Sequence, residues 1–228
     1  PQSALRVDAN DVVIEYNVFE DLVKKSYDQG AFDICSNFSF RGIVIRYNYW
    51  RNINEKRNVA AVRFDDKISG HSVYGNIFEN CGNTYFGAVQ IHGGNHNHIF
   101  HNVFVDCPAA VSFDRWKKER FIKALEEDSK DKNLGMFSTD VYKKRYPELN
   151  KAWDVDINKN YIHDNLIINA KEPYRRDGGE SVITNNKVVT ESTKLTRNIP
   201  KLLRKYNMGD IPYKKMGVQR NIYISNSL

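Results

Sequence analysis

Six copies of one short phrase recur along the chain and constrain its fold more than any other feature. Each copy has an apolar residue, an Asn three positions later and another hydrophobic residue two positions after the Asn. The repeated residues are Asn17, Asn48, Asn76, Asn102, Asn165 and Asn186, at intervals of 31, 28, 26, 63 and 21 residues. A repeat of roughly 20 to 30 residues, rich in β-branched side chains, indicates a solenoid with one coil per repeat. The long interval indicates one coil that carries an insertion.

The residues within each repeat favour short strands over helices. Apolar residues alternate with polar ones, as in residues 60–64, and do not recur three and four positions apart. Gly, Asn and Asp punctuate these runs, which is typical of strands of about five residues joined by tight turns. We therefore predict an all-β fold, a single-stranded right-handed parallel β-helix. The repeated Asn is expected to adopt a left-handed turn conformation, and its amide to hydrogen-bond to the next coil.

A second register supports the same fold. Segments 30–34, 60–64, 87–91 and 109–113 align without gaps, each opening on a small residue. Because side chains alternate along a strand, the third residue of each segment is expected to face the core, and the fourth to point outward. The predicted core column is Phe32, Val62, Val89 and Val111; the outward columns are Asp33, Arg63, Gln90 and Ser112, and then Cys35, Asp65, His92 and Asp114.

Length and composition bound the remaining possibilities. We expect residues 1–228 to form one solenoid domain. No run of 18 apolar residues exists, so no membrane span is predicted. The chain opens at Pro1 inside a repeat, so we expect a mature chain or a fragment, and the absence of a signal peptide is uninformative. Three cysteines cannot pair completely, and Cys81 and Cys107, at one repeat position, are expected to be buried as small hydrophobes.

The chain is basic, with a formal net charge of +6. Basic runs at 117–120, 143–145 and 214–215 could attract an anionic polymer. The solvated faces of helices and loops are the favoured interpretation, and no nucleic-acid-binding motif is present. We therefore predict no nucleic-acid partner.

Residues from about 115 to 154 depart from the repeat and are predicted to form a helical insertion. An amphipathic helix is expected over 115–125, with Trp116, Phe121, Ile122 and Leu125 on one face. A second helix is expected over 138–145, with Ser138 as its N-cap and Pro147 ending it. Because the insertion leaves the strand directly after Asp114, we expect it to form a wall or lid beside the outward columns; packing without any role in binding is the alternative. The tail, 193–228, is expected to contain one short helix and to lie along the solenoid or cap it.

Carboxylates gather on the predicted outward columns. With strands roughly 4.8 Å apart, Asp65 and Asp114 are expected roughly 10 Å from each other. Asp28 begins the strand of Asp33, and Asp66 directly follows Asp65. Hydrolysis of a glycosidic bond requires a carboxylic acid that protonates the leaving oxygen and a carboxylate that activates water or attacks carbon. We therefore predict Asp28, Asp65 and Asp66 as catalytic residues.

Further side chains around these aspartates are predicted to bind the substrate. They are Asp33, Arg63, Gln90, His92, Asp114 and Trp116. The alternative is structural, since outward strand positions are polar by default and Asp33 beside Arg63 could form only a surface ion pair. Residues 92–98 contain three histidines but no carboxylate at ligand spacing, so no metal site is predicted. No cofactor is expected, apart from Ca²⁺ at Asp65 and Asp66 if the protein is a lyase.

Several of these segments resemble a bacterial family of secreted, pectate-lyase-like β-helix proteins related to glycoside hydrolase family 141. The matching segments are 28–32, 42–49, 63–66, 69–78, 91–94, 146–149 and 211–217. The resemblance implies an α-L-fucosidase or xylanase type of activity and a catalytic pair of aspartates. Asp28 and Asp65, 37 residues apart, match that pair, and Asp66 matches the second position equally well. Phe32-Asp33 stands where many relatives carry isoleucine and tyrosine, which implies a different sugar-binding surface.

Three functions follow as hypotheses. The first is a secreted, periplasmic or cell-surface glycoside hydrolase that acts on a plant or microbial cell-wall polysaccharide. The second is a polysaccharide lyase that removes the proton next to a uronate, with Arg63 central to the chemistry. The third is a non-catalytic glycan-binding or structural β-helix, since a fold alone does not select a function.

Overall fold

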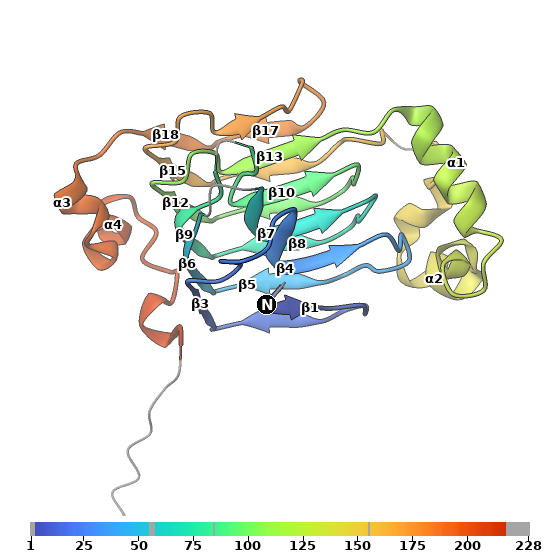
Figure 1. The fold of residues 1–228 in the computed structure, drawn as a ribbon, viewed down its shortest axis with the longest axis horizontal. Coiled ribbons are helices and arrows are strands. Elements are labelled where there is room, and N and C mark those ends of the chain that lie inside the picture. The colour runs from blue at the N-terminus through green and yellow to red at the C-terminus, as the bar shows by residue number, and fades with distance from the viewer. Residues whose placement is uncertain (1–2, 55–57, 84, 155, 218–228) are drawn as a thin grey trace, which may run out of the picture.

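The strands of the described residues form three parallel six-stranded sheets, and each sheet takes every third of these strands (Figure 1). The computed structural model describes residues 3–54, 58–83, 85–154 and 156–217. The first sheet contains β1 (Leu5–Arg6), β4 (Gln29–Cys35), β7 (Val59–Asp65), β10 (Val89–His92), β13 (Val111–Asp114) and β16 (Tyr174–Arg175). The second contains β2 (Val13–Glu15), β5 (Val44–Arg46), β8 (Ser72–Tyr74), β11 (His98–Phe100), β14 (Tyr161–His163) and β17 (Val182–Thr184). The third contains β3 (Val18–Glu20), β6 (Tyr49–Ile53), β9 (Ile77–Cys81), β12 (Val103–Val105), β15 (Leu166–Ile168) and β18 (Lys187–Val189). The predicted parallel β solenoid is confirmed.

The register of the first sheet is the predicted one. Phe32 pairs with Val62, Val62 with Val89 and Val89 with Val111, and all four side chains are fully buried. The third sheet adds an interior stack of aromatic rings, from Phe19 through Trp50 and Phe78 to Phe104. Cys81 and Cys107 are buried next to each other, as predicted, and the Cys81 N–H donates to the Cys107 sulfur at 3.4 Å. These columns bring each outward residue of one coil beside its counterpart in the next coil.

The repeated asparagines form a ladder at the turn between the second and third sheets. The Oδ1 atom of Asn76 accepts from the backbone N–H and the side-chain amide of Asn48, at 3.0 and 3.1 Å. The predicted stacking of amides is therefore confirmed. The prediction of a left-handed Asn is wrong, because that conformation belongs to the residue before it, with φ of 55° at Tyr47 and 52° at His101. The preceding residue makes the turn, so the Asn amide stays aligned with its neighbours.

A second ladder, which the sequence analysis missed, follows the turn between the first and second sheets. The N–H of Ile43 donates to Nδ1 of His71, the N–H of His71 to Asn97, and the N–H of Asn97 to Asn160, all at 3.1–3.2 Å. Burial lowers the pKa of His71 to about 3, so its imidazole is a neutral acceptor. The intervals of 28, 26 and 63 residues equal those between Asn48 and Asn165, and this match is the signal that could have revealed it.

The insertion stands at one end of the sheets and contains the elements α1 (Lys118–Asp128), η1 (Gly135–Ser138), α2 (Asp140–Arg145) and η2 (Pro147–Lys151) (Figure 1). The first helix begins three residues later than predicted, because Trp116 turns back against the coil and contacts His92. The cap of α2 is Thr139 and not Ser138, which lies in the preceding 3₁₀ turn. Phe121 and Leu125 are buried together with Phe38 of the solenoid, in a hydrophobic cluster separate from the solenoid core, so the insertion packs firmly on the coils.

The tail lies along the solenoid, against the outer face of the third sheet (Figure 1). It contains α3 (Thr193–Thr196), α4 (Ile199–Lys205) and η3 (Tyr213–Lys215), where a single helix was predicted. Leu202 and Ile211 are buried against Ile77 and Val103. The last part of the predicted tail, 218–228, lies outside the described residues. Among the helices of the described segments, none combines the length and apolarity needed to cross a bilayer.

Candidate active site

Seven of the nine predicted site residues line one pocket of about 450 Å³ on the outer face of the first sheet. They are Asp28, Arg63, Asp65, Asp66, Gln90, His92 and Asp114. We call this cavity the acidic pocket, because it holds four carboxylates and one guanidinium. The strands β4, β7, β10 and β13 are adjacent in the sheet, so side chains from four successive coils meet there.

Arg63 lies at the centre of the pocket and holds two of the predicted catalytic carboxylates. Its Nη2 atom is 2.9 Å from Oδ1 of Asp28 and 3.1 Å from Oδ2 of Asp65. The Nε–H donates to Oε1 of Gln90 at 3.3 Å, and the guanidinium lies 5.3 Å from the centre of the Phe86 ring. The Arg63 side chain is only 7% exposed, so these contacts fix its position.

Asp65 and His92 form a hydrogen-bonded pair on neighbouring coils. Oδ1 of Asp65 lies 2.8 Å from Nδ1 of His92. Burial alone would raise the pKa of Asp65, but the hydrogen bond from His92 and the charge of Arg63 outweigh it, so this pKa lies below its usual value. An ionised carboxylate can only accept, so Nδ1 of His92 carries the hydrogen. The other ring nitrogen, Nε2, belongs to a side chain that lines the pocket.

Asp66 extends this network from a strained turn. Its Oδ1 atom lies 3.2 Å from Nδ1 of His92 and 3.9 Å from Nη2 of Arg120. Asp66 and Lys67 both have positive φ, at 47° and 62°, which is uncommon for residues other than Gly. The Lys67 ammonium is buried against Asp128, the last residue of α1, at 3.3 Å. The insertion therefore helps to hold the turn that presents Asp66.

Asp33 lies beneath the pocket and not on its wall. It is only 3% exposed, and its Oδ2 atom accepts from the N–H of Gly30 at 2.8 Å. Burial raises the pKa of Asp33 in spite of Arg63, whose Nη1 atom is 3.9 Å away. The pair is thus not on the surface, and a structural role fits Asp33 better than contact with a substrate. Gln90 lines the pocket but is 2% exposed, and it supports Arg63.

Trp116 does not offer an open ring to a sugar. It is 6% exposed, and the Arg120 guanidinium lies 3.7 Å from its ring centre. A Cβ atom on Gly93 would approach the ring to 2.5 Å, so Gly93 allows the close contact between the indole and the coil. The ring meets His92 edge to face at 5.8 Å. Trp116 therefore packs on His92, and its ring is almost entirely covered, although the residue lines a neighbouring depression.

Several wall residues escaped the sequence analysis. Tyr27, Asn58, Tyr85 and Phe86 complete the lining of the acidic pocket. They lie in the connections that precede β4, β7 and β10, where the repeat pattern lapses. Phe86 directly precedes Gly87, which opens the aligned segment 87–91. Its position next to that segment was the signal that could have placed Phe86 in the pocket wall.

Asp65, Asp66 and His92 could supply three metal ligands, because one donor atom from each lies within 4.8 Å of the others. Two cations oppose that use, since Arg63 lies 3.1 Å from Asp65 and Arg120 lies 3.9 Å from Asp66. Both oxygens of Asp65 already accept a hydrogen bond or ion pair. The arrangement therefore suits proton transfer better than a metal ion with two positive charges. The absence of a cofactor remains a prediction.

Comparison with protein-family models, curated proteins and solved structures found no match to the chain.

Proposed function

We propose that the protein is a glycoside hydrolase with the acidic pocket as its active site. One observation carries the proposal: Asp65 is held between Arg63 and His92 in a pocket that also presents Asp28 and Asp66. The contacts keep Asp65 ionised, while the side chain of Asp28 is 59% exposed and reaches the same guanidinium. Cleavage of a glycosidic bond requires two carboxyl groups of this kind, one as the acid and one as the nucleophile or base.

The separation of the pair favours retention of the anomeric configuration. Asp28 and Asp65 contact the same nitrogen of Arg63, at 2.9 and 3.1 Å, so their nearest oxygens are at most about 6 Å apart. Retaining enzymes place their carboxyl groups about 5 to 5.5 Å apart, and inverting enzymes about 6.5 to 9.5 Å.

Two displacements would then complete the reaction. Asp65 attacks the anomeric carbon while Asp28 gives its proton to the departing oxygen, which leaves as an alcohol. Water then attacks the glycosyl-enzyme, returning its proton to Asp28 and freeing Asp65. One water is consumed for each bond cleaved. Asp66 is the alternative to Asp28 as the acid, because it reaches the same histidine.

Other features support the wider proposal. The segments around Asp28 and Asp65 are those that resemble secreted bacterial β-helix proteins of the family 141 type. The handedness is proposed to be right-handed, because crossovers between parallel strands of one sheet are right-handed in nearly all proteins. A polysaccharide outside the cell is the proposed substrate. The lyase hypothesis is less favoured, because Arg63 is buried and engaged with Asp28 and Asp65 and so is a poor base.

The experiment incubates the protein with neutral and uronate-rich polysaccharides while reducing ends and unsaturated-uronate absorbance are followed together. Reducing ends without absorbance are expected, with a loss of roughly 10²-fold or more in Asp65→Asn. Asp140→Asn is the matched control, because this exposed carboxylate lies in α2, away from the pocket lining. Absorbance that rises with the reducing ends would identify a lyase, and silence on every substrate would favour a glycan-binding protein.

An aryl glycoside with an activated leaving group separates the two candidate acids. Such a group departs without protonation, so the variant that lacks the acid retains activity on it and loses activity on the polysaccharide. Asp28→Asn is expected to show this pattern, and Asp65→Asn is expected to be inactive on both. The same pattern in Asp66→Asn, with Asp28→Asn fully active, would reassign the acid to Asp66.

A further inference from the structure

The acidic pocket is one end of a longer surface groove. A second depression, of about 690 Å³, shares Asp114 with the pocket and is lined mainly by residues 113–119, Arg176 and Glu180. A third, of about 380 Å³, shares Lys118, Ile157, Asn158 and Glu180 with the second. We call them the middle and distal depressions. From β4 to β16 the first sheet spans four strand spacings, or roughly 19 Å, enough for a short oligosaccharide.

The charge changes along this groove. The middle depression carries the basic residues Arg115, Lys117, Lys118 and Arg176 and the acidic residues Asp114, Glu119 and Glu180. Glu180 is paired with Arg115 at 3.3 Å. Lys117, Lys118 and Arg176 are exposed, and within the described ranges no carboxylate lies within ion-pair distance of them. The middle depression thus carries a small net positive charge, with four basic against three acidic residues, whereas the adjoining pocket is acidic.

Arg176 is held at the junction of the two. Its guanidinium lies 4.0 Å from the centre of the Tyr85 ring, and Tyr85 lines the acidic pocket. The backbone of Arg176 is left-handed, with φ of 62°, a conformation that costs free energy and persists only where the surroundings impose it. A guanidinium is suited to two parallel hydrogen bonds with a carboxylate.

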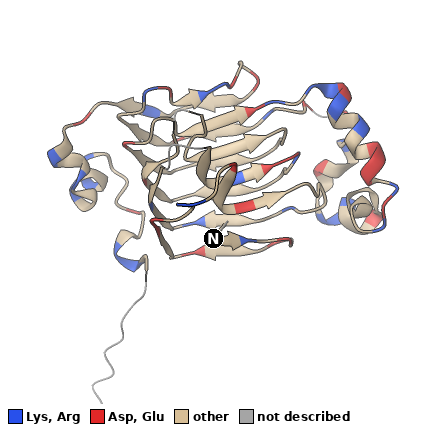
Figure 2. Ribbon diagram, in the orientation of Figure 1, with Lys and Arg blue, Asp and Glu red and all other residues tan. Residues whose placement is uncertain are grey.

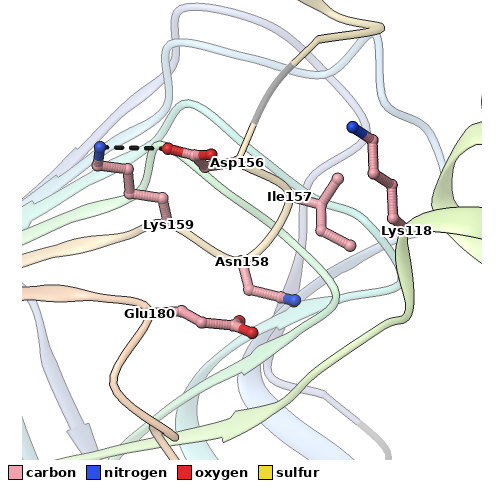
Figure 3. A pocket seen from close by; sticks show the side chains of 6 residues that line it. All are labelled: Lys118, Asp156, Ile157, Asn158, Lys159 and Glu180. Atoms are coloured by element: carbon pink, nitrogen blue, oxygen red, sulfur yellow. Dashed lines mark hydrogen bonds and ion pairs between the residues drawn. The ribbon is translucent and has the colours of Figure 1, made fainter.

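The start of α1 faces the same place. Lys117 is its N-cap and makes no side-chain capping bond, so the partial positive charge of the helix terminus adds to that of the basic side chains. Figure 2 shows basic residues where α1 begins. Figure 3 shows Lys118 across the distal depression from Glu180 and Asn158, while Lys159 is paired with Asp156.

We propose that the middle depression is a subsite for a uronate residue of the glycan, whose carboxylate is bound by Arg176 and Lys118. The inference rests on the proposed function and specifies its substrate: a neutral sugar reacts in the acidic pocket, and the neighbouring sugar is acidic. Four carboxylates repel a uronate from the reacting position, and the unpaired cations attract one next to it. A lyase would need the opposite order, with the uronate at the reacting position.

The test measures binding of the full chain to glucuronoxylan, in which uronate residues neighbour neutral sugars, in its native and its carboxyl-reduced form. We expect the native form to bind about tenfold more tightly than the reduced form at low ionic strength. In Arg176→Gln and Lys118→Gln this preference should fall several-fold. Lys144→Gln, which removes an exposed charge from α2, should leave it unchanged.

Equal binding of the native and reduced forms, or binding of neither, would overturn the uronate subsite. So would a preference that Arg176→Gln and Lys118→Gln leave intact. Reducing ends are measured in the same samples, so the two proposals can fail separately. Hydrolysis of a reduced polysaccharide without the preference would leave the hydrolase standing. Preferential binding without any hydrolysis would retain the subsite and count against the hydrolase.

Discussion

Replacing Asn76 by Ala tests how far the side-chain ladder stabilises the solenoid. The Asn76 amide is fully buried and bridges three coils. Its Oδ1 atom accepts twice from Asn48, and its Nδ2 atom donates to the Ile45 carbonyl at 2.8 Å and to Asn102 at 3.0 Å. The Asn76 Nδ2 atom also lies within hydrogen-bond distance of the Tyr74 carbonyl, but its two hydrogens are already used in the bonds to Ile45 and Asn102. The side chain therefore makes about four independent hydrogen bonds.

The expected cost follows from these bonds. Each contributes about 1 kcal/mol net, so Asn76→Ala should lower the free energy of unfolding by about 4 kcal/mol. Asn17 is the matched control, because it lies at the first step of the same ladder. Its Nδ2 atom donates to Glu15 and Asn48, and no described residue donates to its Oδ1 atom. Asn17→Ala should cost about 1 to 2 kcal/mol, since one of its two bonds is solvent-exposed.

Urea unfolding of the two variants, followed by circular dichroism, measures the difference. The midpoint should move much further for Asn76→Ala, with little change in the slope m. A smaller m would mean that the solenoid has split into separately unfolding parts, which repeat arrays permit. Equal destabilisation by the two variants at constant m would refute the reasoning, because the buried amide of Asn76 would then contribute no more to the free energy of unfolding than the amide of Asn17 at the end of the ladder.

Three further predictions concern the charges around the pocket. Asp65→Asn should be less stable than the wild type above about pH 4, and this difference should vanish as pH falls through the lowered pKa of Asp65. Asp33→Asn should be more stable than the wild type at neutral pH, because the raised pKa of Asp33 means that its charge destabilises the folded state; this advantage should vanish as acid protonates Asp33. Thermal melts from pH 7 to pH 3 check both, and parallel curves would contradict the assignment. Arg63→Met should cost about 3 kcal/mol because Asp33 loses its nearest cation, and adding Asp33→Asn should recover part of that loss in urea unfolding. Lys67→Met should lower the free energy of unfolding by about 3 kcal/mol, because Asp128 is left buried without its cation. The double variant Lys67→Met with Asp128→Leu should have a free energy of unfolding closer to that of the wild type. Equal losses in the single and double variants would rule out the ion pair as the cause.

The outward columns could be predicted because strand periodicity and repeat length fix them together. Once Val62 and Val89 occupy the core column, Asp65 and His92 must lie side by side, and they do at 2.8 Å. The second ladder was equally encoded, since His71 and Asn97 keep the intervals of the first. It was missed because His breaks the run of Asn residues.

The burial of Asp33 could not be predicted from the same pattern. A period of two tells which residues point outward from a sheet, but not what covers them. The cover comes from connections such as the one that carries Phe86 beside Arg63. Asp28 likewise reaches Arg63 from a left-handed position, with φ of 56°, outside the aligned segments. These connections follow no repeat, so their conformations depend on tertiary packing.

The insertion shows how the two kinds of segment combine in one site. Asn102 and Asn165 are 63 residues apart, yet the Asn102 N–H donates to Asn165 at 2.9 Å, as in coils without an insertion. The coil therefore closes normally, and the inserted residues can shape the groove without moving Asp65 or His92. They are not freely removable, because Phe121 packs on Phe38 of the solenoid. If the proposed function holds, changes of glycan preference should arise at exposed positions such as Lys118, while the buried face of α1 and the column of Asp65 and His92 stay constant.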